Sequence, residues 1–296
     1  MKKEDSIIVF LSGGLGNQMF QYAFGRYLSV KNNLPLKLDL SHLNDSAPRP
    51  GYVLRAFALE VFKIDGQIAT KEDTPFLYRR YFSGKIARVV EAFRRKILNN
   101  PGKEKHFQFD QEIFSLTSGV YLEGYWQSPK YFKPIEEIIR NDFALKNPLP
   151  EKIQILVNEI KSCNSLGIFV RRQDYVGNAF HETVNGEYYD KALELILQKE
   201  KIEKIYIITD DKEWCKANMH FDIPYMVAEG YEGEHFVGEM MLLAACKHFI
   251  IPNSTFAWWG AWLSENKNKI IIAPKKWFGD PSINTDDVTP SEWVRI

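Results

Sequence analysis

The second half of the chain alternates regularly between short apolar runs and amphipathic helical stretches. Apolar runs that predict strands cover residues 166–170, 204–209, 224–228, 248–251 and, as the last strand, 269–273. Stretches that predict helices lie between them, at 187–198, 212–218, 233–246 and 255–264. Such alternation is typical of a parallel sheet covered by helices on both faces. We therefore predict a doubly wound α/β domain in this half of the chain.

The first half opens with a β-α-β pattern. The apolar residues 7–11 predict a strand, a glycine turn follows at 13–16, a helix begins at Asn17, and residues 35–40 predict a second strand. A segment with two prolines, 146–150, is the best linker candidate. With 296 residues the chain is long enough for two domains. We predict an N-terminal α/β domain over 1–148 and a C-terminal one over 149–296.

Charge and cysteine content exclude several classes of protein. The chain carries 38 basic and 38 acidic residues, so bulk positive charge for holding nucleic acid is absent. The cysteines Cys163, Cys215 and Cys246 form no CxxC pair, which argues against a zinc site or a disulfide framework. No run approaches the ~18–20 apolar residues of a membrane span, and the first apolar run is too short for a signal peptide. We expect a cytoplasmic protein.

One segment departs from the overall charge balance. Residues 76–105 contain nine Lys or Arg against two Glu, a net of +7, and their apolar residues recur at helical spacing. The ordinary interpretation of the basic helix near residues 79–96 is a solvated helix face. The alternative is peripheral contact with an anionic membrane surface.

Polar residues that suit a nucleoside diphosphate follow three of the predicted strands. Ligands of an open parallel sheet bind beyond the carboxyl ends of its strands. Arginine forks bind phosphate oxygens, a helix N-terminus offers free amides and hydroxyls, and carboxylates accept from ribose or base donors. The residues are Arg171, Arg172 and Asp174 after the first strand, Asp210 and Asp211 after the second, and Asn253, Ser254 and Thr255 after the fourth.

Each of these three groups also has a structural alternative. Asn253 or Ser254 suits the N-cap of a helix. Arg171 suits an ion pair with Asp174 or with a distant Glu, and Asp210 suits a turn at the end of a strand. A different enzyme class is also open, because Gly14-x-Gly16 followed by Asp39 is a partial dinucleotide fingerprint. Its third glycine position is Met19, but an NAD(P)-dependent oxidoreductase remains an alternative.

Five segments resemble the motifs of bacterial α-1,2-fucosyltransferases, glycosyltransferase family eleven. The resemblance covers essentially the whole chain, from about Ile7 to Trp293. The segments are Gly13-Gly14-Leu15-Gly16-Asn17-Gln18-Met19-Phe20-Gln21-Tyr22, Leu122-Glu123-Gly124-Tyr125-Trp126-Gln127-Ser128, Val170-Arg171-Arg172-Gln173-Asp174-Tyr175-Val176, Thr209-Asp210-Asp211-Lys212-Glu213-Trp214-Cys215 and Asn253-Ser254-Thr255-Phe256-Ala257-Trp258-Trp259-Gly260. For the tryptophans Trp258, Trp259 and Trp262 we expect core packing of at least two.

The resemblance implies a GT-B-like fold, in which two Rossmann-type domains face each other across a cleft. It implies that the C-terminal domain binds GDP-fucose and that the N-terminal domain takes the acceptor side. It also implies that the loop with Gly14 faces the cleft as part of the binding site, with the Asn17 and Gln18 amides offered to the sugars. It further implies inverting transfer of L-fucose to the 2-hydroxyl of a terminal galactose in a glycan or lipopolysaccharide precursor, without a cofactor or catalytic metal. No Asp-x-Asp occurs among the 15 aspartates, so the usual metal-chelating motif of nucleotide-sugar enzymes is missing.

Two positions depart from the family pattern. The family usually has His where this chain has Phe169 and Gly where it has Gln173. An apolar Phe169 cannot hydrogen-bond a phosphate or a sugar, and Gln173 adds bulk beside the ligand. A degenerate sugar-nucleotide-binding protein without turnover is therefore a further alternative.

The general base is expected beside the arginine motif, next to the reacting carbon of the donor. His181 has the better intrinsic pKa for this work near neutrality. Asp174 lies close to two arginines, which would depress its pKa and favour an orienting role. Glu182 and Glu187 are weaker candidates, and transfer through an oxocarbenium-like state without a strong base remains open.

Overall fold

The computed structural model describes residues 5–45, 55–74, 100–181 and 184–296. The chain divides into two compact units, Met1–Ala144 and Leu145–Ile296. Each unit contains one parallel sheet with helices, so the predicted α/β class is confirmed. The proline segment 146–150 opens the second unit.

The first unit is built on a four-stranded sheet in the order β3-β2-β1-β4. Strand β1 lies in the middle and pairs in parallel with β2 and with β4. The main elements are β1 (Ile7–Phe10), α1 (Leu15–Asn32), β2 (Leu36–Asp39), β3 (Gln67–Ile68), α3 (Gln111–Phe114), β4 (Val120–Leu122) and α4 (Glu136–Asp142), with 3-10 turns at Leu59–Val61, Pro129–Tyr131 and Lys133–Ile135.

Helix α1 begins two residues earlier than the sequence predicts. Gly14 is its N-cap, in an extended conformation, and its carbonyl accepts from the backbone N–H groups of Asn17 and Gln18, each at 3.0 Å. Asn17 therefore lies in the first helical turn and is not the N-cap. A glycine suits this position because the chain turns sharply from β1 into the helix.

The second unit is built on a six-stranded parallel sheet in the order β10-β9-β8-β5-β6-β7. Its strands are β5 (Ser165–Val170), β6 (Lys204–Thr209), β7 (Tyr225–Val227), β8 (His248–Ile250), β9 (Ile271–Ala273) and β10 (Val294–Arg295). Its helices are α5 (Glu151–Ser162), α6 (Gly186–Leu197), α7 (Lys212–Asn218), α8 (Val237–Ala245) and α9 (Thr255–Leu263).

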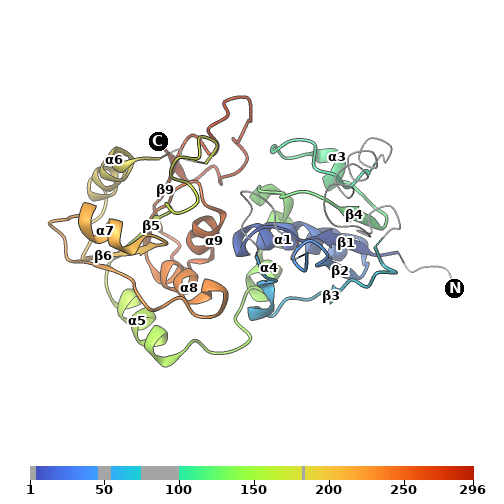
Figure 1. The fold of residues 1–296 in the computed structure, drawn as a ribbon, viewed down its shortest axis with the longest axis horizontal. Helices are drawn as coiled ribbons and strands as arrows, with labels where there is room; N and C mark the ends of the chain where they lie inside the picture. Colours follow the sequence, from blue (N-terminus) through green and yellow to red (C-terminus); the bar gives the residue numbers. More distant parts are fainter. Residues whose placement is uncertain (1–4, 46–54, 75–99, 182–183) are drawn as a thin grey trace. The chain divides into compact units, whose positions relative to one another are not determined.

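Helices cover both faces of this sheet, with α6 and α7 on one side and α5 and α8 on the other (Figure 1). The side chains of Leu166, Ile168 and Val170 on β5 belong to the cluster that packs against α6 and α7. On the opposite face of the sheet, helix α8 packs closely against Gly167. A Cβ at this position would lie only 2.7 Å from Leu243 Cδ1 of α8, so a larger residue would clash. Burial of both faces explains why these strands read as continuous apolar runs.

Two predictions about element bounds are wrong. The last strand is β10, which pairs with β9, and not the segment 269–273; its two residues are too few to give a periodic signal. Helix α8 begins at Val237, because His235 and Phe236 have φ angles of 49° and 62°, which interrupt a right-handed helix. The prediction for the tryptophans is confirmed, since Trp258, Trp259 and Trp262 are all buried.

Within the described part of the chain, no helix is long and apolar enough to cross a membrane. The basic helix predicted near residues 79–96 lies outside the described residues.

Candidate functional site

The polar residues of the second unit gather where its sheet changes direction. From β5 the chain continues to β6 and β7 on one side, and then returns to β8, β9 and β10 on the other side. Strands β5 and β8 are neighbours, so the loops that follow them flank this switch point. In open α/β sheets this is the usual place for a ligand. The sequence prediction that the arginine motif and the Asn253 segment share one edge agrees with this topology.

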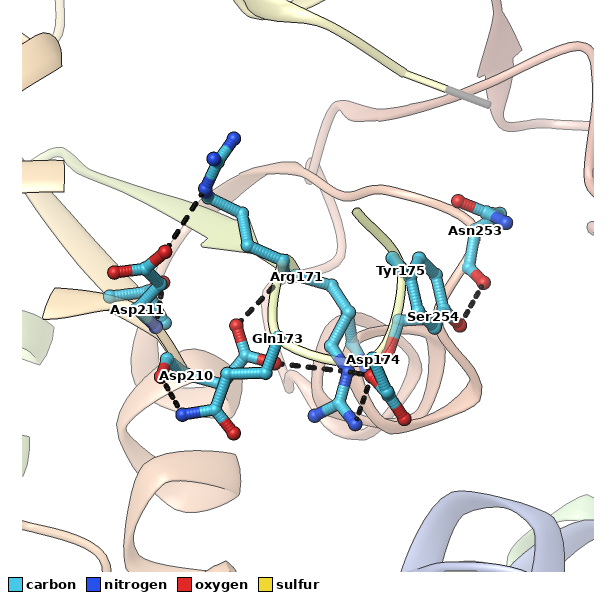
Figure 2. A network of polar contacts seen from close by, with 11 residues as sticks. Arg171, Gln173, Asp174, Tyr175, Asp210, Asp211, Asn253 and Ser254 are labelled. Carbon is cyan, nitrogen blue, oxygen red and sulfur yellow. Dashed lines mark hydrogen bonds and ion pairs between the residues drawn. The ribbon is translucent and has the colours of Figure 1, made fainter. Parts of the chain in front are cut away.

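Arg171 lies among carboxylates at this edge (Figure 2). Its Nε donates to Asp174 Oδ1 at 2.8 Å and lies 3.1 Å from Asp210 Oδ2. Burial acts to lower the pKa of Arg171, but the bond to Asp174 and the charge of Asp210 outweigh it and raise the pKa above its usual value. The ion pair between Arg171 and Asp174, which the sequence analysis gave as a structural alternative, is therefore present.

Arg172 is held by a different set of groups. Its Nε lies 3.1 Å from Asp211 Oδ2, and its guanidinium carbon lies 3.9 Å from the centre of the Trp214 ring. Its backbone N–H donates to Asp210 Oδ1 at 2.8 Å. The sequence analysis does not predict the cation–π contact with Trp214. The sequence shows only an arginine and, about 40 residues later, an Asp-Asp-x-x-Trp segment, and this spacing does not indicate a contact.

Both aspartates after β6 are used within the protein. Burial raises the pKa of Asp210, and the neighbouring Arg171 charge opposes this rise. Asp211 is the N-cap of α7, because its side chain accepts from the backbone N–H of Trp214. Asp210 thus lies at the end of a strand, as the structural alternative expects, and it also forms an ion pair with Arg171. Both carboxylates therefore have partners within the protein.

The loop after β8 leads into helix α9. Ser254 is the N-cap and its Oγ accepts from the Ala257 N–H at 3.5 Å, while Thr255 is the first helical residue. The Asn253 amide donates to the carbonyls of His181 at 2.9 Å and Trp277 at 2.8 Å. Its Oδ1 is buried and has no hydrogen-bond partner among the described residues. Asn253 therefore ties three loops together beside the helix N-terminus.

His181 lies in an aromatic cluster next to the arginine loop. Its ring stacks on Tyr175 with the centroids 5.0 Å apart, and it meets Phe180 edge to face at 4.9 Å. Burial lowers the pKa of His181; the Asp174 charge opposes this shift and the Arg171 charge adds to it. The ring is therefore neutral at pH 7, the form that can accept a proton. Glu182, the weaker base candidate, lies outside the described residues.

The two departures from the family pattern have clear structural roles. Phe169 is buried and packs against Phe256 of α9, with ring centroids 5.4 Å apart. Gln173 is exposed, and its amide donates to the Asp210 carbonyl at 2.6 Å. Phe169 thus adds to the core, and Gln173 joins the loops after β5 and β6.

A buried carboxyl near this edge was missed by sequence reasoning. Burial raises the pKa of Glu239 on α8 to about 7; Lys212, whose Nζ lies 3.6 Å away, opposes this rise. Lys212 is shared with Glu232, at 2.6 Å. The available signal was an acidic residue within the otherwise apolar stretch 237–246.

The site residues predicted in the first unit have different surroundings. Gly14 is the N-cap of α1 and Asn17 lies in the first turn of this helix, at the carboxyl edge of the first sheet. Gln18 is fully buried: its amide donates to the carbonyls of Gly13 and Ala56, and its oxygen accepts from the Ala58 N–H. The expectation that Gln18 presents its amide to a sugar is therefore wrong, because backbone groups occupy it.

Comparison with known proteins identifies the family. The family model "Glycosyl transferase family 11" matches residues 94–296. The chain is 32% identical to an alpha-1,2-colitosyltransferase of Escherichia coli, over 98% of each chain. The chain belongs to glycosyltransferase family 11. A second relative from Escherichia coli, the O-antigen biosynthesis glycosyltransferase WbnK, is 29% identical over 97% of this chain and 99% of its own.

Solved structures agree at the level of the fold. The NodZ alpha-1,6-fucosyltransferase, solved after soaking with GDP-fucose, matches with a TM-score of 0.53 and 17% identity over 88% of this chain and 93% of its own. A NodZ structure from Bradyrhizobium matches with a TM-score of 0.53 and 18% identity over 88% and 94%. This family 11 chain is thus a glycosyltransferase with a GT-B-like fold, and the oxidoreductase alternative finds no support.

Proposed function

We propose that this family 11 enzyme transfers L-fucose from GDP-fucose to the 2-hydroxyl of a terminal galactose, with inversion at the fucose anomeric carbon. The observation that carries the proposal is the pair of arginines that follow β5 at the switch point of the second sheet, where the neighbouring strand β8 leads into the N-terminus of α9. The α-1,2 linkage is supported by the name of the relative that is 32% identical over nearly its whole length. The product belongs to a glycan or lipopolysaccharide precursor, as the name of the O-antigen relative supports.

The second unit is proposed to hold the donor. The leaving GDP carries negative charge that grows as the bond to the sugar breaks. Arg171, Arg172 and the amides at the start of α9 supply the positive charge and hydrogen-bond donors that stabilise it. The carboxylates of Asp174, Asp210 and Asp211 hold these arginines in place before the donor arrives. The first unit is proposed to take the acceptor.

A metal is not needed in this arrangement, so we expect transfer to continue in EDTA. The sequence lacks Asp-x-Asp, and two arginines lie where the diphosphate charge would be met. The measurement is initial rate with and without excess EDTA. Complete loss of activity that Mn²⁺ or Mg²⁺ restores would contradict the expectation. Modest stimulation by these ions would not, because they also pair with released GDP and relieve product inhibition.

His181 is proposed as the general base that takes the proton of the acceptor hydroxyl. We expect His181→Ala to lower kcat about 10²-fold with little change in donor affinity, the lower end of what a positioned base contributes. Because burial lowers its pKa, His181 is neutral above the ordinary value of 6.5 and becomes protonated as the pH falls below its own pKa. The wild-type kcat should therefore decline on the acid side, and the variant should lose this limb.

The control for this variant is His220→Ala, since His220 is exposed and has local contacts with Tyr225 and Ala217. Asp174→Asn should instead weaken donor binding and kcat together, because it loosens Arg171. If His181→Ala kept full kcat from pH 5 to 8, the base would have to be another group or absent.

The deciding experiment is incubation of the enzyme with GDP-fucose and a panel of galactose-terminated acceptors, followed by linkage analysis. An α-1,2-fucosyl galactoside supports the proposal. GDP-colitose belongs in the same experiment, because a relative is named for colitose transfer; preference for it would replace fucose by colitose. Binding of GDP-fucose without turnover of any acceptor would favour the degenerate binding protein.

Two further proposals concern the location of the enzyme. We propose that the enzyme acts in the cytoplasm, where nucleotide sugars serve as donors for precursor assembly. We also propose that the basic segment near residues 79–96 contacts an anionic membrane surface, on the strength of its charge alone.

A further inference from the structure

The mid-chain segment Gly124–Gln127 forms a turn at the carboxyl edge of the first sheet. It follows β4, which pairs with β1, and β1 leads through a glycine turn into the start of α1, which contains Asn17. From β1 the chain continues to β2 and β3 on one side, and β4 lies on the other side. The turns after β1 and β4 therefore flank the switch point of this sheet, the place where ligands bind in open α/β folds.

This turn is held in a strained conformation by the carboxylate of Glu104. Trp126 has a φ of 56°, a left-handed conformation that is costly for a bulky residue. The Glu104 carboxylate accepts from the backbone N–H of Tyr125 at 2.7 Å and of Trp126 at 2.9 Å. The Trp126 ring is fully buried and lies 4.9 Å from Phe24, centroid to centroid. Strain that is kept in place in this way is typical of functional sites.

The conformation determines which neighbouring side chain is buried and which faces solvent. Trp126 points into the core, whereas Tyr125 is 37% exposed. On the other side of Trp126, the Gln127 amide donates to Asn17 Oδ1 at 3.2 Å and so joins the turns after β4 and β1. The Gln127 Oε1 is buried and has no hydrogen-bond partner among the described residues. An unsatisfied buried carbonyl is costly, and a hydroxyl donor would satisfy it.

The chemistry of these groups differs from that of the second unit. An exposed phenol ring and two neutral amides carry no charge that would hold a diphosphate. A ring beside amides suits a neutral sugar, because the apolar face of the sugar packs on the ring while its hydroxyls bond to the amides. The phenol and amides of the first unit thus suit a neutral group, and the arginines of the second unit suit an anionic one.

We propose that Tyr125 and the Asn17–Gln127 amide pair form the subsite for the terminal galactose of the acceptor. Tyr125 packs against the apolar face of the sugar, and Gln127 Oε1 accepts from one of its hydroxyls. This inference rests on the proposed function for the identity of the sugar. It assigns a role to the mid-chain motif, which the donor chemistry leaves without one.

The test separates acceptor binding from donor binding and from stability. Tyr125→Ala should raise the acceptor KM about tenfold, whereas the donor KM, the affinity for GDP and the thermal unfolding midpoint stay at the wild-type values. Tyr125→Phe keeps the ring and should stay within twofold of wild type. Gln127→Met, of similar volume, should also raise the acceptor KM. The matched control is Ile68→Ala, since Ile68 is an exposed apolar residue on β3, at the other edge of the same sheet.

A binding measurement without turnover keeps this inference distinct from the proposed function. Saturation-transfer NMR with methyl β-galactoside should show binding to wild type and to Tyr125→Phe, and loss of the signal with Tyr125→Ala. If wild type binds the galactoside in this way but transfers no fucose, the proposed function fails and the subsite stands. Equal signals from wild type and Tyr125→Ala, no binding by wild type, or an unchanged acceptor KM in Tyr125→Ala would overturn the subsite.

Discussion

Arg172→Ala is expected to lower kcat/KM for transfer by about 10²–10³-fold, the loss seen when one group that stabilises transition-state charge is removed. The Arg172 guanidinium is held between Asp211 and the face of Trp214, so its position is set before the donor binds. The free energy of unfolding should change by less than about 1 kcal/mol, because the pair with Asp211 is partly exposed to solvent. Initial-rate kinetics and urea denaturation measure the two effects separately.

The control for this prediction is Arg140→Ala, which removes an arginine paired with Glu136 on α4. It should leave both activity and stability near wild type. Arg172→Lys keeps the charge but loses the planar fork and the stacking on Trp214, so its activity should lie between those of wild type and Arg172→Ala. Wild-type rates in Arg172→Ala would show that the donor phosphates are met elsewhere.

Arg171→Ala is expected to damage both transfer and folding. Removing this guanidinium leaves Asp210, whose side chain is only 13% exposed, beside Asp174 without the charge that both share. Breaking a buried ion pair from one side costs about 3–5 kcal/mol, and this partly buried pair should lie at or below the lower end of that range. We therefore expect the free energy of unfolding to fall by about 3 kcal/mol, and kcat/KM by at least as much as in Arg172→Ala.

The stability loss in Arg171→Ala should depend on pH. Burial already raises the pKa of Asp210, and the variant removes the Arg171 charge that opposes this rise. A carboxyl whose pKa is higher in the folded than in the unfolded protein destabilises the fold as the pH rises above the unfolded value. The variant should therefore be less destabilised at pH 5 than at pH 8, as measured by urea denaturation at both values.

A second substitution distinguishes the structural effect from the effect on the donor. Asp210→Asn in the Arg171→Ala background removes the unpaired charge and should restore most of the stability without restoring transfer. A double variant that regained transfer would mean that Arg171 acts only through folding. A single variant as stable as wild type at both pH values would mean that this ion pair contributes little.

Much of the second unit could be predicted because its signals are local. Helix α7 and strand β6 have the predicted bounds, and the other strands differ by at most two residues at either end. The arginine motif and the Asn253 segment were expected at one edge because parallel strands all end on the same side of a sheet. Strand β10 was missed because its two residues form a strand only by pairing with β9.

The roles of individual polar side chains were predicted less well. Gln18 looked like a ligand group in a glycine turn, yet backbone atoms of a distant loop at Ala56 and Ala58 occupy its amide. Glu239 is marked in the sequence only as an acidic residue within an apolar stretch, and burial raises its pKa to about 7. Neither outcome follows from spacing along the chain, because each depends on which distant groups lie within hydrogen-bond reach.

The sequence by itself determined the type and order of the elements, and with them the sheet edges at which chemistry-bearing residues gather. Apolar periodicity and glycine turns involve only a few neighbouring residues, so they can be recognised in the sequence without a structure. Only the tertiary structure decided which of those residues are engaged within the protein: Arg171 with Asp174 and Asp210, Arg172 with Asp211 and Trp214. Arg171 and Asp174 are three residues apart, so the sequence could offer that pair. The pairings with Asp210, Asp211 and Trp214 depend on distances between strand ends that lie some 40 residues apart in the chain, and these distances are fixed by packing.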